Sequence, residues 1–271
     1  FEIDRVAFHI GSLPVYWYGI LIALGFILAI LYVTKRAKEF GVDPDRMLDV
    51  VLGGAIGGIV GARAYFVLLR WDYYGQNLDQ IFNTRSGGMA IYGGLIGGLL
   101  VGLLMCKLRK VKAKPALDLV VGGFFIGQCI GRWGNFINRE AFGRETAAFS
   151  RMGLTLPGRE TVYVHPTFLY ESLWNFAGFL MLHFWFRKHE RRFDGELILL
   201  YAVWYGIGRA LIEGLLTDSL YITGTGIRVS QLLAGVSAAA AAVVLALLYT
   251  GKLRHPPRYV DRESGEAQQD A

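Results

Sequence analysis

The chain has 271 residues, of which 54% are hydrophobic and 18% are charged. Soluble domains carry about 25% charged residues and rarely repeat uncharged apolar runs of about 18 residues, so this composition excludes soluble, disordered and collagen-like proteins. The net charge of +6 reflects loop topology in a membrane protein, and we predict no nucleic-acid partner.

Seven apolar runs are long enough to cross a hydrocarbon core of about 30 Å. In chain order they are residues 15–33, 47–69, 89–106, 117–136, 168–186, 197–216 and 229–249. The first run is expected to stay in the mature protein, because basic residues follow it and do not precede it. The sequence therefore predicts an all-α integral membrane protein with seven transmembrane helices, which form one domain over residues 1–251.

The lysines and arginines between these runs are distributed unevenly. Seventeen of the 28 follow the first, third, fifth and seventh runs, and about half as many lie on the other side. Cytoplasmic loops carry the excess of basic residues, so we predict the N-terminus outside and the C-terminus in the cytoplasm. Residues 139–166, between the fourth and fifth helices, predict a small cap on the outer face. The polar residues 252–271 predict a disordered cytoplasmic tail.

Glycine makes up 35 of the residues and recurs at every fourth position in three runs. The three stripes are Gly53, Gly57 and Gly61; Gly94, Gly98 and Gly102; and Gly123, Gly127 and Gly131. Small residues at this spacing let helices approach closely in lipid, so helix packing is the first interpretation. The alternative is a lipid-accessible cleft lined by bare backbone.

Three arginines lie inside predicted helices, where a charge normally faces a polar cavity. At 1.5 Å per residue from the cytoplasmic ends, Arg63, Arg132 and Arg209 come about 24, 22 and 18 Å into a core of about 30 Å. All three are therefore expected in the outer half. The polar residues expected at a similar level are Tyr18, Tyr92, Asn135, Asn138, Glu171 and Glu213.

Converging guanidinium groups suit the phosphate of an anionic lipid that enters from the outer leaflet. Two structural alternatives stay open. Arg209 and Glu213 are four residues apart on one helix and could neutralise each other. Arg132 could extend to the outer interface.

Several stretches of the sequence resemble one family. The segment 131–138, Gly-Arg-Trp-Gly-Asn-Phe-Ile-Asn, followed by Glu140, Gly143 and Arg144, resembles the signature of bacterial prolipoprotein diacylglyceryl transferases. Further stretches match along nearly the whole chain in the expected order. They are residues 17–19, 61–63, 87–97, 165–171 and 205–209, together with Glu213.

The resemblance implies a multi-pass enzyme of the bacterial cytoplasmic (inner) membrane with its cap in the periplasm. Such an enzyme moves the diacylglyceryl group of phosphatidylglycerol onto the lipobox cysteine thiol of a prolipoprotein signal peptide, and glycerol 1-phosphate leaves. This is the first step of bacterial lipoprotein maturation. The resemblance implies no metal and no organic cofactor.

For that reaction we expect Arg132 and Arg209 to stabilise the departing phosphate and Glu140 to orient the arginine cluster. For Arg63 and Glu213 the resemblance supports only an indirect part. The residues expected to act in catalysis are Arg132, Arg209, Tyr92 and Glu140. Those expected to bind or position the substrate are Tyr18, Arg63, Asn135, Asn138, Gly143 and Glu213.

One position departs from the family pattern. Many members carry a histidine directly before the glycine pair of the third helix, where this chain has Tyr92. A tyrosine, whose ordinary pKa is about 10, is a poor base at neutral pH. Tyr92 is therefore expected to hydrogen-bond the lipid, while Glu140, the leaving phosphate or water removes the proton. His165 is an alternative base, although its place before Pro166 favours a structural role.

Two other classes of protein compete with this interpretation. An outer-leaflet lipid or solute transporter would also use glycine-interrupted helices and buried charges. However, the polar residues gather on one side, and no inverted repeat is evident. A retinal-type receptor is suggested only by the seven runs, and the last run contains no lysine that could form a Schiff base.

Overall fold

The structure is a computed structural model that describes residues 3–84, 87–156, 158–185, 191–217, 226, 228–255 and 258–261. The chain divides into two compact units, each with its own internal packing. Unit 1 comprises Phe1–Tyr32 and Leu117–Arg258, and unit 2 comprises Val33–Ala116 and Tyr259–Ala271.

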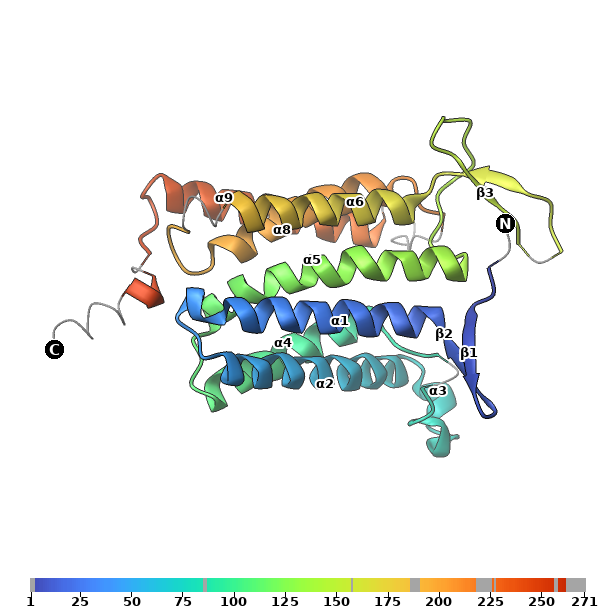
Figure 1. Cartoon of the computed structure of the whole chain (residues 1–271), viewed down its shortest axis with the longest axis horizontal. Coiled ribbons are helices and arrows are strands. Elements are labelled where there is room, and N and C mark those ends of the chain that lie inside the picture. The colour runs from blue at the N-terminus through green and yellow to red at the C-terminus, as the bar shows by residue number, and fades with distance from the viewer. Residues whose placement is uncertain are drawn as a thin grey trace. The chain divides into compact units, whose positions relative to one another are not determined.

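Unit 1 contains most of the helices. α8 packs against both α6 and α9, and Figure 1 shows the three side by side. α1 and α5 each have one end that belongs to unit 2. The helices are α1 (Trp17–Arg36), α5 (Ala113–Asn138), α6 (Thr167–Leu180), the π-helical η3 (Met181–Trp185), α8 (Glu196–Glu213) and α9 (Val229–Tyr249).

Two short antiparallel hairpins complete unit 1. The first pairs β1 (Val6–Ile10) with β2 (Leu13–Tyr16), and the second pairs β3 (Met152–Leu154) with β4 (Val162–Val164). The second hairpin lies within the predicted cap. The first explains why α1 begins two residues later than the apolar run 15–33, since residues 13–16 are paired in a strand.

Unit 2 is built around α2 (Pro44–Leu69) and α4 (Ile91–Leu108), which pack along each other. Its shorter elements are η1 (Ala37–Phe40), α3 (Trp71–Tyr74) and η2 (Leu78–Gln80). Tyr259 and Val260, from the predicted tail, lie against Gly41. Residues 262–271 of that tail are outside the described residues.

Among the described residues, five helices are long and apolar enough to cross a membrane: α1, α2, α4, α5 and α9. This confirms a mostly helical membrane protein. The other two predicted runs also contain helices. However, α6 has only 14 residues before the backbone becomes π-helical, and α8 carries three charges, at Glu196, Arg209 and Glu213.

Glycines bring α2 and α4 into backbone contact, as the packing interpretation predicts. A Cβ placed on Gly61 would lie 2.4 Å from the carbonyl oxygen of Gly93, and one on Gly97 would lie 2.3 Å from that of Gly57. On α4 the tightest contacts therefore fall one residue before the predicted stripe. On α5 a Cβ at Gly127 would meet no described atom within 4 Å.

We expect Gly97→Ala to destabilise unit 2 by about 1–3 kcal/mol, the usual cost of overpacking, because the obstacle is backbone. Gly127→Ala is the matched control. It should be neutral or stabilising, since alanine is favoured over glycine in a helix by about 1 kcal/mol. Thermal unfolding of the two purified variants in detergent measures the difference. Equal midpoints would show that α2 and α4 do not need this close approach.

Candidate active site

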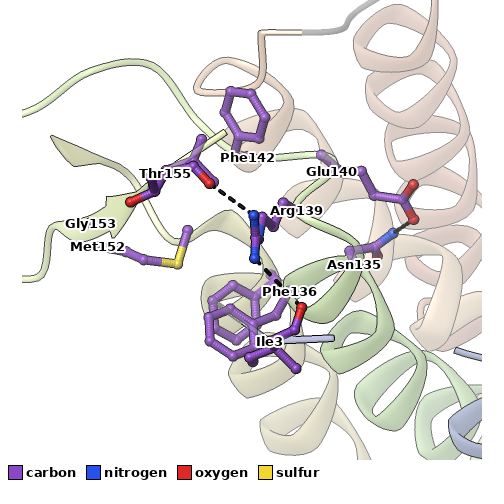
Figure 2. A pocket seen from close by; sticks show the side chains of 12 residues that line it. Ile3, Asn135, Phe136, Arg139, Glu140, Phe142, Met152, Gly153 and Thr155 are labelled. Atoms are coloured by element: carbon purple, nitrogen blue, oxygen red, sulfur yellow. Dashed lines mark hydrogen bonds between the residues drawn. The ribbon is translucent and has the colours of Figure 1, made fainter. Parts of the chain in front are cut away.

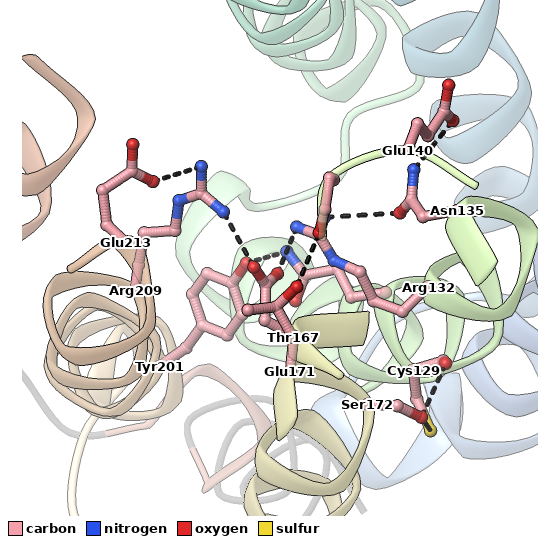
Figure 3. A network of polar contacts seen from close by, with 12 residues as sticks. Cys129, Arg132, Asn135, Glu140, Thr167, Glu171, Ser172, Tyr201, Arg209 and Glu213 are labelled. Carbon is pink, nitrogen blue, oxygen red and sulfur yellow. Dashed lines mark hydrogen bonds and ion pairs between the residues drawn. The ribbon is translucent and has the colours of Figure 1, made fainter. Parts of the chain in front are cut away.

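Two arginines from different helices of unit 1 bind one buried carboxylate. Glu171 on α6 forms ion pairs with Arg132 on α5 and with Arg209 on α8. The distance from Arg209 Nη1 to Glu171 Oε1 is 2.9 Å. Arg209 also pairs with Glu213, one turn further along α8, at 2.5 Å between Nη2 and Oε2. Figure 3 shows these side chains as one network.

The two carboxylates are buried, whereas both arginines stay partly exposed. The side chains of Glu171 and Glu213 are 6% and 1% exposed, against 23% and 21% for Arg132 and Arg209. Ser230 Oγ donates a further hydrogen bond to Glu213 at 2.9 Å. The buried carboxylates therefore anchor the arginines on their protein-facing side. A planar guanidinium held in this way can present its remaining donors to an anion such as phosphate.

At the end of α5 two asparagines bind Glu140. Its Oε1 accepts hydrogen bonds from Asn135 Nδ2 at 2.9 Å and from Asn138 Nδ2 at 3.3 Å. Arg132 Nη1 lies 3.5 Å from Asn135 Oδ1, which connects the asparagines to the arginine network. Within the described residues Glu140 makes no ion pair with either arginine. Glu171 is the residue that contacts both, whereas Glu140 was expected to orient them.

The backbone around Glu140 is strained. Arg139 and Ala141 have positive φ angles of 56° and 50°, a conformation that costs a non-glycine residue about 1–3 kcal/mol. Arg139 Nη1 donates to the carbonyl of Thr155 at 3.1 Å, and Thr167 Oγ1 donates to that of Ala141 at 2.6 Å. Such strain persists only where surrounding contacts enforce it, so these bonds fix the path of the chain at Glu140.

A small, largely apolar pocket adjoins Asn135 and Glu140, between the end of α5 and β3 (Figure 2). Its lining includes Phe136, Phe142 and Met152. Arg139 lies against it. The pocket therefore places an apolar surface beside the polar end of α5.

Gly143 and Tyr18 also belong to this part of unit 1. The Gly143 N–H donates to the carbonyl of His165 at 3.0 Å, and a Cβ on Gly143 would lie 2.6 Å from His165 Cβ. The backbone at Gly143 therefore lies close to the segment after β4. Tyr18 packs on α5, where a Cβ on Gly134 would lie 2.4 Å from its ring.

Arg63 and Tyr92 belong to unit 2, whereas the site residues described so far belong to unit 1. Arg63 is 8% exposed, and its guanidinium donates at 2.7–3.1 Å to four backbone carbonyls, those of Gln80, Ile81, Gly87 and Gly88. A guanidinium has five N–H donors, so little capacity is left for a ligand. Arg63 therefore holds the connection between α3 and α4. Tyr92 is half-buried in the first turn of α4.

His165 contacts neither arginine among the described interactions. Its Nδ1 lies 3.3 Å from the hydroxyl of Tyr170, which in turn bonds Ser150 at 2.7 Å. This network links β4, α6 and the loop before β3, which agrees with a structural role. Among the described residues, no group of three or more histidines, cysteines or acidic residues could hold a metal ion.

Comparison with known proteins identifies the family. A family model described as prolipoprotein diacylglyceryl transferase matches residues 5–247. Proteins named phosphatidylglycerol–prolipoprotein diacylglyceryl transferase from Bacillus cytotoxicus and Bacillus cereus are 44% and 45% identical to it over 228 residues, which cover 82% of this chain and 84% of theirs. A protein of the same name from Bacillus anthracis is 45% identical over the same length. The chain belongs to the prolipoprotein diacylglyceryl transferase family.

Proposed function

We propose that this protein transfers the diacylglyceryl group of phosphatidylglycerol to the lipobox cysteine thiol of a prolipoprotein signal peptide and releases glycerol 1-phosphate. Its family membership and the names of its relatives support this activity. The main structural support for the site is that Arg132 and Arg209 both pair with Glu171. This places two partly exposed guanidinium groups on one buried carboxylate.

In this reaction the thiol sulfur attacks the glyceryl carbon that bears the phosphate ester. A carbon–sulfur bond forms, and the bond from that carbon to the phosphate oxygen breaks. Arg132 and Arg209 meet the negative charge on the departing phosphate. The thiol proton passes to Glu140, to the leaving phosphate or to water. The step involves no net oxidation or reduction.

The other expected site residues have supporting parts in this proposal. Asn135 and Asn138 hold Glu140 beside the arginine network, and Tyr18 contacts the lipid head group from the start of α1. Gly143 keeps the chain after Glu140 close to His165. Glu213 holds Arg209, and Arg63 acts indirectly through the connection that it binds.

The proposed setting is the bacterial inner membrane, with all seven helical segments as spans, the N-terminus outside and residues 139–166 as a periplasmic cap. The basic loops support this orientation. We include α6 and α8 among the spans although they carry charges. Glu171 and Glu213 are buried, as expected when charges in a span face the bundle interior. In this orientation the arginine network opens toward the outer leaflet.

The activity is tested with the full-length protein in phosphatidylglycerol vesicles and a synthetic lipobox peptide. We expect the peptide mass to rise by one diacylglyceryl group, while glycerol phosphate is released in equal amount. A peptide with serine in place of cysteine is the control and should stay unmodified. If folded protein gives no thioether product, the proposal fails. Flux of a labelled lipid or solute without product would favour the transporter alternative.

Tyr92→Phe should reduce turnover less than tenfold. The variant loses one hydrogen bond to the lipid, worth about 1 kcal/mol, and a tyrosine is a poor proton acceptor at neutral pH. Initial rates of peptide modification measure the effect, and Tyr65→Phe in the same unit is the matched control. A kcat lowered more than a hundredfold at unchanged KM would instead make Tyr92 the base.

A further inference from the structure

We infer that a second site, a basic pocket in unit 2, binds a phosphate group, and that in the membrane this is the head-group phosphate of an anionic lipid. The pocket lies between the start of α2 and the end of α4, and Tyr259 borders it. Its cationic lining residues are Arg46, Lys110 and Lys112. None of them belongs to the arginine network of unit 1.

The pocket carries a surplus of positive charge. Asp43 is its one acidic lining residue, and its carboxylate caps α2 by accepting the Arg46 N–H at 2.9 Å. Nearby, Arg109 is neutralised by Asp49 at 2.7 Å. In the part of the chain that the structure describes, no ion pair involves the three cationic lining residues, and all three are exposed. The first turn of the 26-residue α2 adds the partial positive charge of a helix N-terminus.

Lys110 occupies a backbone position that glycine normally takes. Its φ is 58°, and it ends α4 in a Schellman motif: the Val111 N–H donates to the Cys106 carbonyl at 2.8 Å, and the Lys110 N–H to the Lys107 carbonyl at 3.3 Å. A side chain in this left-handed conformation is strained, and such strain concentrates at binding sites. A lysine that is unfavourable for the helix end but lines a pocket fits a ligand-binding role.

The position of the pocket favours a lipid over other anions. It lies at the ends of two helices that are long and apolar enough to cross a membrane. In the proposed orientation these ends are cytoplasmic, where anionic lipids attract basic segments and basic pockets between helices bind lipid head groups. The pocket holds about 250 Å³, whereas one water molecule in the liquid takes roughly 30 Å³, so a phosphate group fits.

The competing explanation is topological. Basic residues gather on the cytoplasmic side of membrane proteins to set their orientation, wherever in the loops they lie. That rule predicts a diffuse positive surface on which Lys107, Lys110, Lys112 and Lys114 are equivalent. The pocket instead predicts a sharp difference between lysines that line it and lysines that do not. Lys114, two residues after Lys112 and also exposed, is the matched control.

The test measures lysine acetylation, read by peptide mass spectrometry, in the full-length protein in nanodiscs. The discs contain phosphatidylcholine alone or phosphatidylcholine with a minor share of phosphatidic acid, and a third sample adds inorganic phosphate to the neutral discs. We expect phosphatidic acid to slow labelling of Lys110 and Lys112 at least about fivefold and that of Lys107 and Lys114 less than about twofold, because only a pocket holds the head group in place. Equal slowing at all four lysines would overturn the site. Selective slowing by inorganic phosphate alone would keep the site and assign it to free phosphate.

Two variants separate ligand binding from folding. Arg46→Gln should abolish the protection of Lys112, whereas Lys114→Gln should leave it intact. Lys110→Gly removes a charge but also relieves the strained φ, so it should keep or raise the thermal midpoint while it lowers the protection of Lys112. Protection of Lys112 that persists in both Arg46→Gln and Lys110→Gly would contradict the site.

Discussion

Arg132→Ala and Arg209→Ala are each expected to lower the turnover of phosphatidylglycerol by at least about a hundredfold, because removing one donor from a preorganised anion site typically costs 10²–10³ in kcat. The two side chains bind Glu171 from different helices, and each remains partly exposed. In the proposed reaction they meet the negative charge that develops as the phosphate leaves. The rate of thioether formation on a lipobox peptide measures the loss.

Lysine variants and a control define the cause of that loss. Arg132→Lys and Arg209→Lys keep the charge but lose the planar fork that can bind a carboxylate and a phosphate together, so they should recover only part of the activity. Arg151→Ala is the matched control, since Arg151 lies outside the network and stacks over Tyr163. If Arg151→Ala lost as much activity as Arg209→Ala, general surface charge and not this pair would be responsible.

Glu171→Gln is expected to have the second-largest effect and to lower kcat about tenfold to a hundredfold. The change keeps the size of the side chain but removes the charge that lies between two guanidinium groups. Removing one partner of a buried ion pair costs about 3–5 kcal/mol, and this is an upper bound here because both arginines are partly exposed. The thermal midpoint should therefore fall as well, which makes a second readout necessary.

A double-mutant cycle supplies that readout. If Glu171 acts by positioning the arginines, the activity losses of Glu171→Gln and Arg132→Ala should be far less than additive when the two are combined. Glu213→Gln is the comparison, because Glu213 contacts Arg209 and no ion pair joins it to Arg132 in the described part of the chain. Additive losses, or a fall in stability with unchanged kcat, would reduce Glu171 to a structural residue.

Local features of the site could be predicted from the sequence because they depend on spacing along one helix. Arg209 and Glu213 are four residues apart, and the structure pairs them. Asn135 and Asn138 are three residues apart on α5, and both donate to Glu140 just after the helix ends. The glycine stripe on α2 likewise faces another helix, because helical periodicity alone places its members on one side.

Contacts between distant segments could not be predicted in this way. The depth estimate placed Glu171 at the level of the arginines, but only the packing of α6 with its neighbours puts it against both of them. Depth along the helix groups Arg63 with the other two arginines, but in the structure its guanidinium donates to backbone carbonyls beyond α3. Neither the path of that connection nor the turn that exposes those carbonyls leaves a periodic signal in the sequence.

The predicted element boundaries are wrong where apolar composition does not distinguish one backbone conformation from another. The run 168–186 reads as one helix, yet the α-helix ends at Leu180 and a π-helical segment follows. The run 15–33 includes strand residues, because apolar side chains suit a paired strand as well as a span. Lys110 is a further case, because the residues around it give no sign of its left-handed backbone conformation, which glycine usually adopts.

The most direct test of the central claim compares two lipid donors, phosphatidylglycerol and its methyl phosphotriester, which lacks the phosphate charge. If Arg132 and Arg209 bind that charge, wild-type protein should prefer the charged donor, and the preference should shrink at least about tenfold in Arg209→Ala, in line with the strength of a charge-assisted hydrogen bond. The same shrinkage is expected in Arg132→Ala. An unchanged preference in both variants would contradict the assignment of the arginine pair to the donor phosphate.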